Sequence, residues 1–178
     1  VQTMREMDRK DGRVQQIHNR LARDCIQGGL VLQVNERASS ETLQREWRAL
    51  QGRLQLEMYE KLRRDARGFV MEGNLPLQLG LNERQDVVAA IRMPSDTIQP
   101  ITDMGGRFKN PATAWEQRDV MTGATLSTWA AWPMSVARLD PDNFDDLGSM
   151  GRPFLDSCAH VWRKLTMTEE DLVMRRRM

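Results

Sequence analysis

Helical spacing of apolar residues dominates the first third of the chain. Over residues 40–67, apolar side chains recur at intervals of three and four, which predicts one long amphipathic helix. Ser40 is suited to cap the start of this helix and Gly68 to end it. Its apolar stripe is expected to pack on a sheet of the same chain and comprises Leu43, Trp47, Leu50, Leu54, Met58 and Leu62.

A shorter helix is predicted before the long one. Val14, Ile17, Leu21 and Cys25 share one helical face, so the helix should begin near Asp11 and end at the glycine pair 28–29. Residues 30–34 are mostly aliphatic and short in extent, which predicts a strand between the two helices.

From residue 69 to residue 139, short apolar runs alternate with prolines and glycines, a pattern typical of strands and turns. Residues 69–71 are a strand candidate. Residues 115–119 and 124–128 flank a glycine-containing turn and predict a hairpin. Residues 134–139 predict a further strand.

The last element is predicted to be a helix over residues 153–177. Pro153 suits the first helical position, where its missing N–H costs nothing. Phe154, Cys158, Trp162 and Leu165 form a stripe that is expected to pack on the sheet. The fold class is therefore α+β, in three parts: a helical part with one short strand (1–68), a β-rich part (69–152) and an amphipathic helix (153–178).

Composition narrows the class of protein. The chain has 178 residues, 40% hydrophobic and 29% charged, so it can form a globular core. Its formal net charge of +1 gives little long-range attraction for nucleic acid or an anionic membrane. Two cysteines suit a reducing cytoplasm, and no apolar run approaches the roughly 18 residues of a membrane span.

No catalytic, cofactor-binding or metal-binding residue is predicted. Only His18 and His160 could serve a nucleophile as base, and neither has the sequence context of a known triad. Neither a P-loop nor a dinucleotide-binding glycine motif occurs, so the glycine pairs 28–29 and 105–106 are interpreted as turns.

Two groups of residues have metal-ligand chemistry, and each also has a simpler interpretation. His18, Cys25, Cys158 and His160 have the ligand chemistry of one zinc, but Cys158 and His160 would diverge by about 200° on a helix. The acids Asp145, Asp146 and Glu170 could form a metal-assisted hydrolase site. Turn chemistry explains the first two more simply, and a solvated helix face explains the run 169–171. The arginines 175–177 are interpreted as a basic helix end.

Four segments, in this order, resemble one known family. Residues 98–101 are followed by Asp103 and Gly105. Residues 134–139 form the next segment, and residues 146–151 lead as a turn into Phe154. The last segment combines Trp162 with the acidic residues 169–171 and the basic residues 175–176. Together they resemble the body segment of the tailed-bacteriophage portal protein, the head-to-tail connector. Ala137 stands where that family typically has histidine.

The resemblance implies a structural function and no enzyme activity. Portal subunits form a ring, in the family a dodecamer, at one capsid vertex; double-stranded DNA is packaged and ejected through it, and the tail attaches to it. The implied partners are further copies of the chain, the major capsid protein, the terminase motor, a head–tail adaptor and the DNA. Assembly would take place in the host cytoplasm and the product would reside in the virion.

The resemblance also sets expectations for arrangement. Residues 69–152 would be wing-like, residues 153–178 would lead towards a stem, and the stem, clip and crown would lie outside this segment. The charged edge of the long helix, including Arg45 and Arg48, would face a neighbouring subunit. The alternative is a non-portal virion adaptor, or another protein-interaction module, without a DNA channel.

Overall fold

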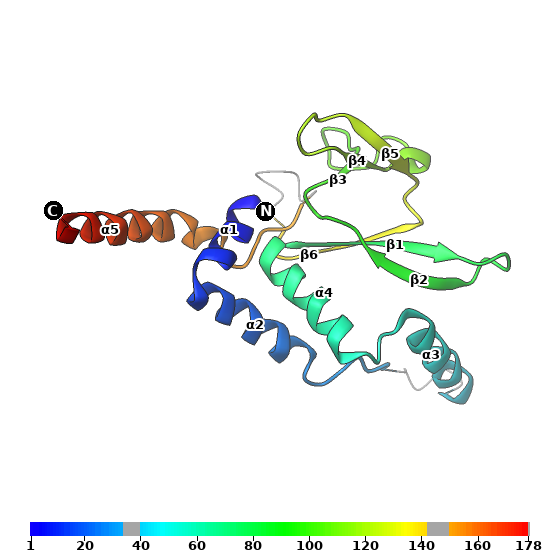
Figure 1. Cartoon of the computed structure of the whole chain (residues 1–178). Helices are drawn as coiled ribbons and strands as arrows, with labels where there is room; N and C mark the ends of the chain where they lie inside the picture. Colours follow the sequence, from blue (N-terminus) through cyan, green and yellow to red (C-terminus); the bar gives the residue numbers. More distant parts are fainter. Residues whose placement is uncertain (34–39, 142–149, 178) are drawn as a thin grey trace.

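The computed structural model describes residues 1–33, 40–141 and 150–177 (Figure 1). Over these residues the chain combines α-helices with two small antiparallel sheets, so the predicted α+β class is confirmed. None of the described helices has both the length and the apolar character needed to cross a bilayer. The helices are α1 (Gln2–Lys10), α2 (Gly12–Ile26), α3 (Ser40–Leu54), α4 (Tyr59–Glu72) and α5 (Ala159–Arg177).

The strands form two separate three-stranded sheets. The first has the order β2-β1-β6 and the second the order β3-β4-β5. Because β3, β4 and β5 lie between β2 and β6 in sequence, the second sheet is an insertion into the first, and Figure 1 shows it on its own level. The strands are β1 (Asn74–Leu81), β2 (Val87–Arg92), β3 (Ile98–Pro100), β4 (Trp115–Arg118), β5 (Thr125–Trp129) and β6 (Met134–Arg138).

Two apolar clusters hold these layers together. One joins α1, α2 and α4 through buried side chains that include Met4, Met7 and Met71. The other joins the two sheets, because Met134 of β6 packs with Ile98 and Trp115 of the inserted sheet. The insertion is therefore fixed to the first sheet by side-chain packing as well as by its two chain connections.

Helix α2 confirms the predicted position of the first helix. Asp11 caps it by accepting a hydrogen bond from the backbone N–H of Arg13 at 2.9 Å. The predicted apolar face of this helix was wrong. After Val14, the buried residues are His18 and Ala22, each one position beyond the predicted Ile17 and Leu21. Ile17 and Cys25 are exposed. Helix α1 was not predicted, since charged residues outnumber apolar ones in it.

The single long helix predicted over residues 40–67 is wrong. Helix α3 ends at Leu54, and Gln55 has a φ of 56°, in the left-handed region that breaks a helix. Helix α4 then continues through Gly68, so this glycine does not end it and the predicted strand over 69–71 is also helical. Residues 30–33 form no strand, and Val34 lies outside the described residues.

The apolar stripe of α3 is less buried than expected. Helix α3 packs beside β2, as predicted for a helix on the sheet of its own chain. However, Leu43 is 42% exposed, and Trp47, Leu50 and Leu54 are only half-buried. A single edge strand is too narrow to cover the whole stripe, so part of it faces solvent.

The β-hairpin and the last strand are confirmed. β4 and β5 pair antiparallel around a turn in which Gly123 has a φ of 71°. Asp119 stabilises that turn, because its Oδ1 accepts the backbone N–H of Met121 at 2.7 Å and of Thr122 at 2.9 Å. These two hydrogen bonds lower the pKa of Asp119. β6 lies within the predicted range 134–139.

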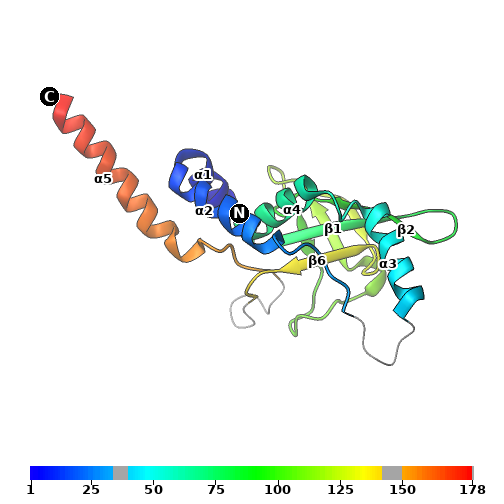
Figure 2. The same cartoon turned by 90° about the horizontal axis from the view of Figure 1, so that it is seen from below.

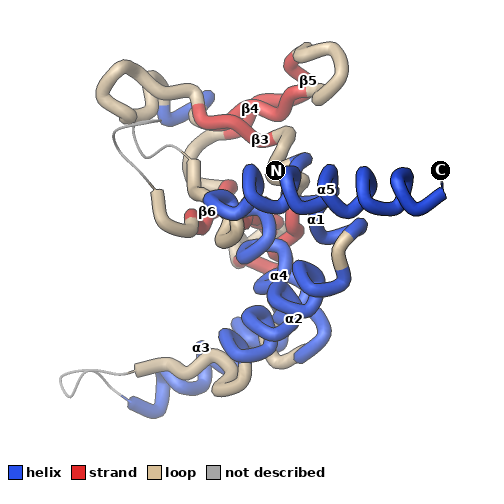
Figure 3. The backbone as a smooth tube through the Cα atoms, turned by 90° about the vertical axis from the view of Figure 1, so that its left-hand side faces the viewer, coloured by secondary structure: helices blue, strands red, loops and turns tan. Residues whose placement is uncertain are grey.

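Helix α5 differs from the prediction in its start and in its packing. It begins at Ala159, after a 3-10 turn over Asp156–Cys158, and Pro153 lies before both. It does not pack on a sheet. It contacts α1 near its beginning and then extends away from the other elements (Figures 1 and 3). Phe154, Cys158 and Leu165 are consequently exposed.

Candidate functional site

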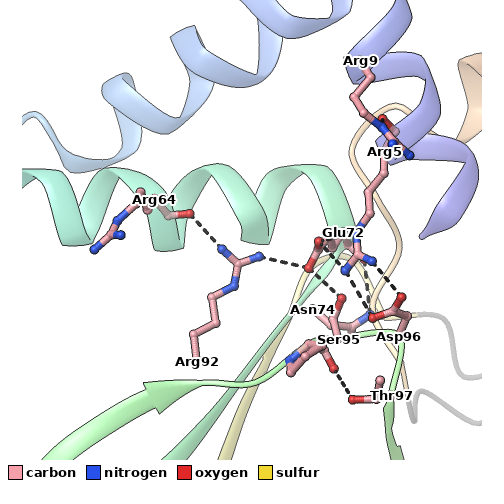
Figure 4. Close-up of polar contacts among 10 residues, drawn as sticks. Arg5, Arg9, Arg64, Glu72, Asn74, Arg92, Ser95, Asp96 and Thr97 are labelled. Carbon is pink, nitrogen blue, oxygen red and sulfur yellow. Dashed lines mark hydrogen bonds and ion pairs between the residues drawn. The ribbon is translucent and has the colours of Figure 1, made fainter. Parts of the chain in front are cut away.

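The most extensive polar network of the described residues joins α1, the end of α4 and the segment between β2 and β3 (Figure 4). Glu72 is its centre and is only 3% exposed. Its Oε1 accepts Arg5 Nε at 2.9 Å, and its Oε2 accepts Arg92 Nη2 at 3.0 Å and Ser95 Oγ at 2.7 Å. Arg5 also donates to both oxygens of Asp96, at 2.7 and 3.2 Å.

Each carboxylate in this network is held by an arginine. Partial burial on its own would lower the pKa of Arg5, but hydrogen bonds to Asp96 and Glu72 outweigh that effect and raise it. Bidentate arginine–carboxylate pairing also fixes orientation. The network therefore sets the angle between α1, α4 and the start of the inserted sheet, which begins directly after Asp96 and Thr97.

Gly68 is what allows Arg92 to reach Glu72. A Cβ atom at residue 68 would lie 1.8 Å from Arg92 Nη2, so the guanidinium occupies the space that a side chain would fill. From that position Arg92 Nη1 also donates to the carbonyl of Arg64 at 3.1 Å. Gly68 was predicted to end a helix. It lies within α4 instead, and its missing side chain leaves room for the guanidinium of Arg92 against that helix.

A second polar cluster lies between α1, α2 and α4. His18 is fully buried, and its Nδ1 lies 2.8 Å from Asp8 Oδ1. Arg67 Nη2 donates to Asp8 Oδ2 at 2.6 Å, and Arg67 Nε donates to Asn19 at 2.8 Å. Burial would raise the pKa of Asp8, but the hydrogen bonds from His18 and Arg67 together lower it. Within the described residues, His18 Nε2 has no hydrogen-bond partner.

This cluster predicts a dependence of stability on pH. Because the pKa of Asp8 is lower in the folded chain than in the unfolded one, its carboxylate stabilises the fold above the unfolded pKa, near 4. That contribution is lost as the pH falls through the folded value. Asp8→Asn should lower the free energy of unfolding at neutral pH by about 1–3 kcal/mol. Urea denaturation over a pH series would measure both effects.

The matched comparison is the slope of stability against pH. Wild-type protein should lose more stability than Asp8→Asn between about pH 5 and pH 2, so the two curves should converge in acid. Parallel curves would show that Asp8 carries no folding-linked proton, contrary to the geometry.

The structure gives positions for most of the residues that have metal-ligand chemistry. Cys25 on α2, Cys158 before α5 and His160 on α5 are exposed, while His18 is buried against Asp8. Over the described ranges, no three histidines, cysteines or acids are grouped so that they could hold a metal ion. Glu170 is exposed on α5, and Asp145 and Asp146 lie outside the described residues.

The glycine pairs considered as phosphate loops lie in turns. Gly29 has a φ of 66° and directly follows the last turn of α2. Gly106 has a φ of 74° in the connection between β3 and β4, where Asp103 Oδ1 accepts the backbone N–H groups of Gly105 and Arg107. The acceptor of these N–H groups is thus a side chain of the protein itself.

Beside the Glu72 network lies an open hollow of about 700 Å³, bordered by α1 and Asp96. Its lining includes Arg5, Arg9 and Lys10, but also Glu6, which binds Lys10 at 2.7 Å. The cations are therefore largely neutralised by neighbouring acids, and no serine or cysteine nucleophile lines the hollow. Chemically, the arrangement ties α1 and the segment between β2 and β3 to the end of α4 through arginine–carboxylate pairs.

Sequence reasoning missed every member of the Glu72 network. The partners Arg5 and Asp96 are 91 residues apart in sequence, so no local spacing reveals the pair. One available signal was an acid that directly follows an apolar run, since Glu72 comes after Phe69, Val70 and Met71. A carboxylate in that position is either exposed by a turn or paired in the interior.

Comparisons with known proteins add no family to this description. The sequence matches no protein-family profile, and a search of curated proteins gives no match.

Proposed function

We propose that this chain is the body of a tailed-phage portal protein. In this proposal it forms a ring at one capsid vertex, double-stranded DNA passes through the ring during packaging and ejection, and the tail attaches to it. The order of the four portal-like segments along the sequence is the basis of the proposal. The major capsid protein, the terminase motor and a head–tail adaptor are its proposed partners in the virion.

One structural observation supports the proposal most directly. The sheet β3-β4-β5 is inserted between β2 and β6 of the other sheet. The first portal-like segment, residues 98–101, begins that insertion, and the second, residues 134–139, follows it as β6. In this proposal the inserted sheet belongs to the wing, and the two segments flank it.

The test is the oligomeric state of the protein. Mass photometry and negative-stain microscopy should find closed rings of about a dozen subunits, which is cyclic assembly through one repeated interface. A protein that stays monomeric or dimeric at micromolar concentration would contradict the proposal and favour the adaptor alternative.

A portal of this kind is expected to have no catalytic turnover of its own. The buried carboxylates Asp8 and Glu72 are bound by arginines, which leaves neither free to act as a general base. Purified protein should therefore hydrolyse neither ATP nor DNA with Mg²⁺ or Mn²⁺ present. Turnover that disappears in Asp145→Asn or Glu170→Gln would instead support the metal-assisted hydrolase alternative.

A further inference from the structure

Helix α3 ends in a stop motif that its sequence does not favour. The backbone N–H of Leu56 donates to the carbonyl of Gln51 at 2.9 Å. The N–H of Gln55 donates to the carbonyl of Gly52 at 3.3 Å, and the two bonds together are the pattern of a Schellman motif. This motif needs a residue in the left-handed conformation, which glycine usually supplies. Gln55 takes that conformation here, with a φ of 56°, so its backbone is strained.

The start of α4 also lacks the residue that usually stabilises a helix end. A serine, threonine, aspartate or asparagine side chain normally accepts one of the first free N–H groups of a helix. Met58 occupies this position, and its side chain makes no capping hydrogen bond. Residues 53–67 contain neither glycine nor proline. The local sequence therefore gives no reason for the chain to bend between α3 and α4.

Contacts with distant segments hold the bend instead. Figures 1 and 2 show α3 and α4 pointing in different directions, and α3 packs beside β2. The side chains of Trp47, Leu50 and Leu54 are half-buried there. Gln51 adds a hydrogen bond to the carbonyl of Leu30, which at 3.3 Å is long. The orientation of α3 thus depends on a narrow surface that is remote in sequence from the bend.

We propose that Gln55 is a hinge, and that residues 40–72 form one continuous helix when α3 leaves β2. The apolar spacing continues across the bend from Leu54 to Met58 and Leu62, so one helix face stays apolar throughout. Straightening returns Gln55 to the right-handed region and gives the backbone groups at the bend ordinary helical partners. The two conformers exchange the α3–β2 contact for an unstrained helix. This inference concerns a single chain and does not depend on the proposed ring.

Pulsed electron paramagnetic resonance measures the position of α3 in the whole protein. The two exposed native cysteines are first changed, as Cys25→Ser and Cys158→Ser. Nitroxide labels are then attached at Ala49→Cys on α3 and at Arg84→Cys in the turn that leads into β2, both at exposed positions. Labelled chains are diluted into unlabelled protein, so that only distances within one chain are measured. Without further changes, the labels should give the short distance of a helix beside β2.

Trp47→Ala should release α3, because it removes the largest of the half-buried side chains. The distance between the labels should then increase, while the helical signal in far-UV circular dichroism is kept because the released helix joins α4. Leu50→Ala should act in the same direction. An unchanged distance in both variants would overturn the hinge. A longer distance with a loss of helical signal would also overturn it, since α3 would then have unfolded instead of straightening.

Gln55→Gly tests the hinge residue itself. In the Trp47→Ala background it should shift the ratio of bent to straight chains towards the bent form by about tenfold or more, because glycine takes the left-handed conformation without strain and weakens a continuous helix. Gly52→Ala is the matched control, because residue 52 belongs to a helix in both conformers and no atom lies within 4 Å of an added Cβ. The control should leave the ratio unchanged. Equal distance distributions with glutamine and glycine at position 55 would contradict the hinge and leave the portal proposal untouched.

Discussion

Replacing Glu72 with leucine is expected to lower the free energy of unfolding by about 3 kcal/mol, because it removes one partner from a buried ion network. The side chain of Glu72 is 4% exposed, whereas those of Arg5 and Arg92 are 32% and 29% exposed. Water can therefore solvate the two arginines in part, which places the expected loss at the lower end of the range for such networks. Ser95, only 2% exposed, would also lose its acceptor.

Urea denaturation of Glu72→Leu would measure this loss. The control is Glu60→Leu in the first turn of the same helix, where the glutamate is 69% exposed and pairs with Arg63 at 3.1 Å. That exposed pair should contribute little. If both variants have similar stability, the network around Glu72 does not hold α1 and the β2–β3 segment in place.

The sequence predicted elements well where local chemistry alone decides them. Asp11 caps α2 because a side-chain oxygen can reach a backbone N–H two residues on, whatever the rest of the fold does. The hairpin around Gly123 follows in the same way from a glycine with positive φ and from the local hydrogen bonds of Asp119. Neither feature depends on a distant partner.

Predictions were wrong where a distant partner decides the conformation. The apolar spacing is continuous across Leu54 and Met58, but Gln55 takes a left-handed conformation that lets α3 turn towards β2. Glycine often ends a helix, but Gly68 lies within α4. Its missing side chain leaves space for Arg92, which is 24 positions further along the chain. Helix α4 ends at Gly73, which takes a left-handed conformation. A side chain at this position would collide with the backbone of Arg152 and Pro153, which are distant in sequence.

The same difference between local and distant partners applies to the candidate site. Sequence reasoning argued against a zinc site at His18, Cys25, Cys158 and His160 on the premise that Cys158 and His160 lie on one helix. Cys158 lies instead in the 3-10 turn before α5, and His18 is bound to Asp8. The residues of the Glu72 network were not identified, because Arg5, Glu72 and Asp96 come from three elements that only the packing of the fold brings together.

Gly73→Ala is expected to destabilise the chain by at least about 3 kcal/mol, through two effects that add. Gly73 has a φ of 75°, which an alanine adopts only at a cost of about 1–2 kcal/mol. An added Cβ would also lie 2.4 Å from the carbonyl carbon of Arg152 and 2.6 Å from the nitrogen of Pro153. These are backbone atoms, so relief requires the segment before α5 to move.

That movement would separate several elements at once. The carbonyl of Gly73 accepts the backbone N–H of Leu139 at 2.8 Å, and Asn74 binds both the N–H and the carbonyl of Gly151. Gly29→Ala isolates the first effect, because Gly29 has a similar φ of 66° but no atom within 4 Å of an added Cβ. It should cost only about 1–2 kcal/mol. Equal losses for the two variants in thermal unfolding would show that the close approach at Gly73 carries no energetic weight; a larger loss at Gly73 would assign the difference to the backbone contact that joins α4, β6 and the start of α5.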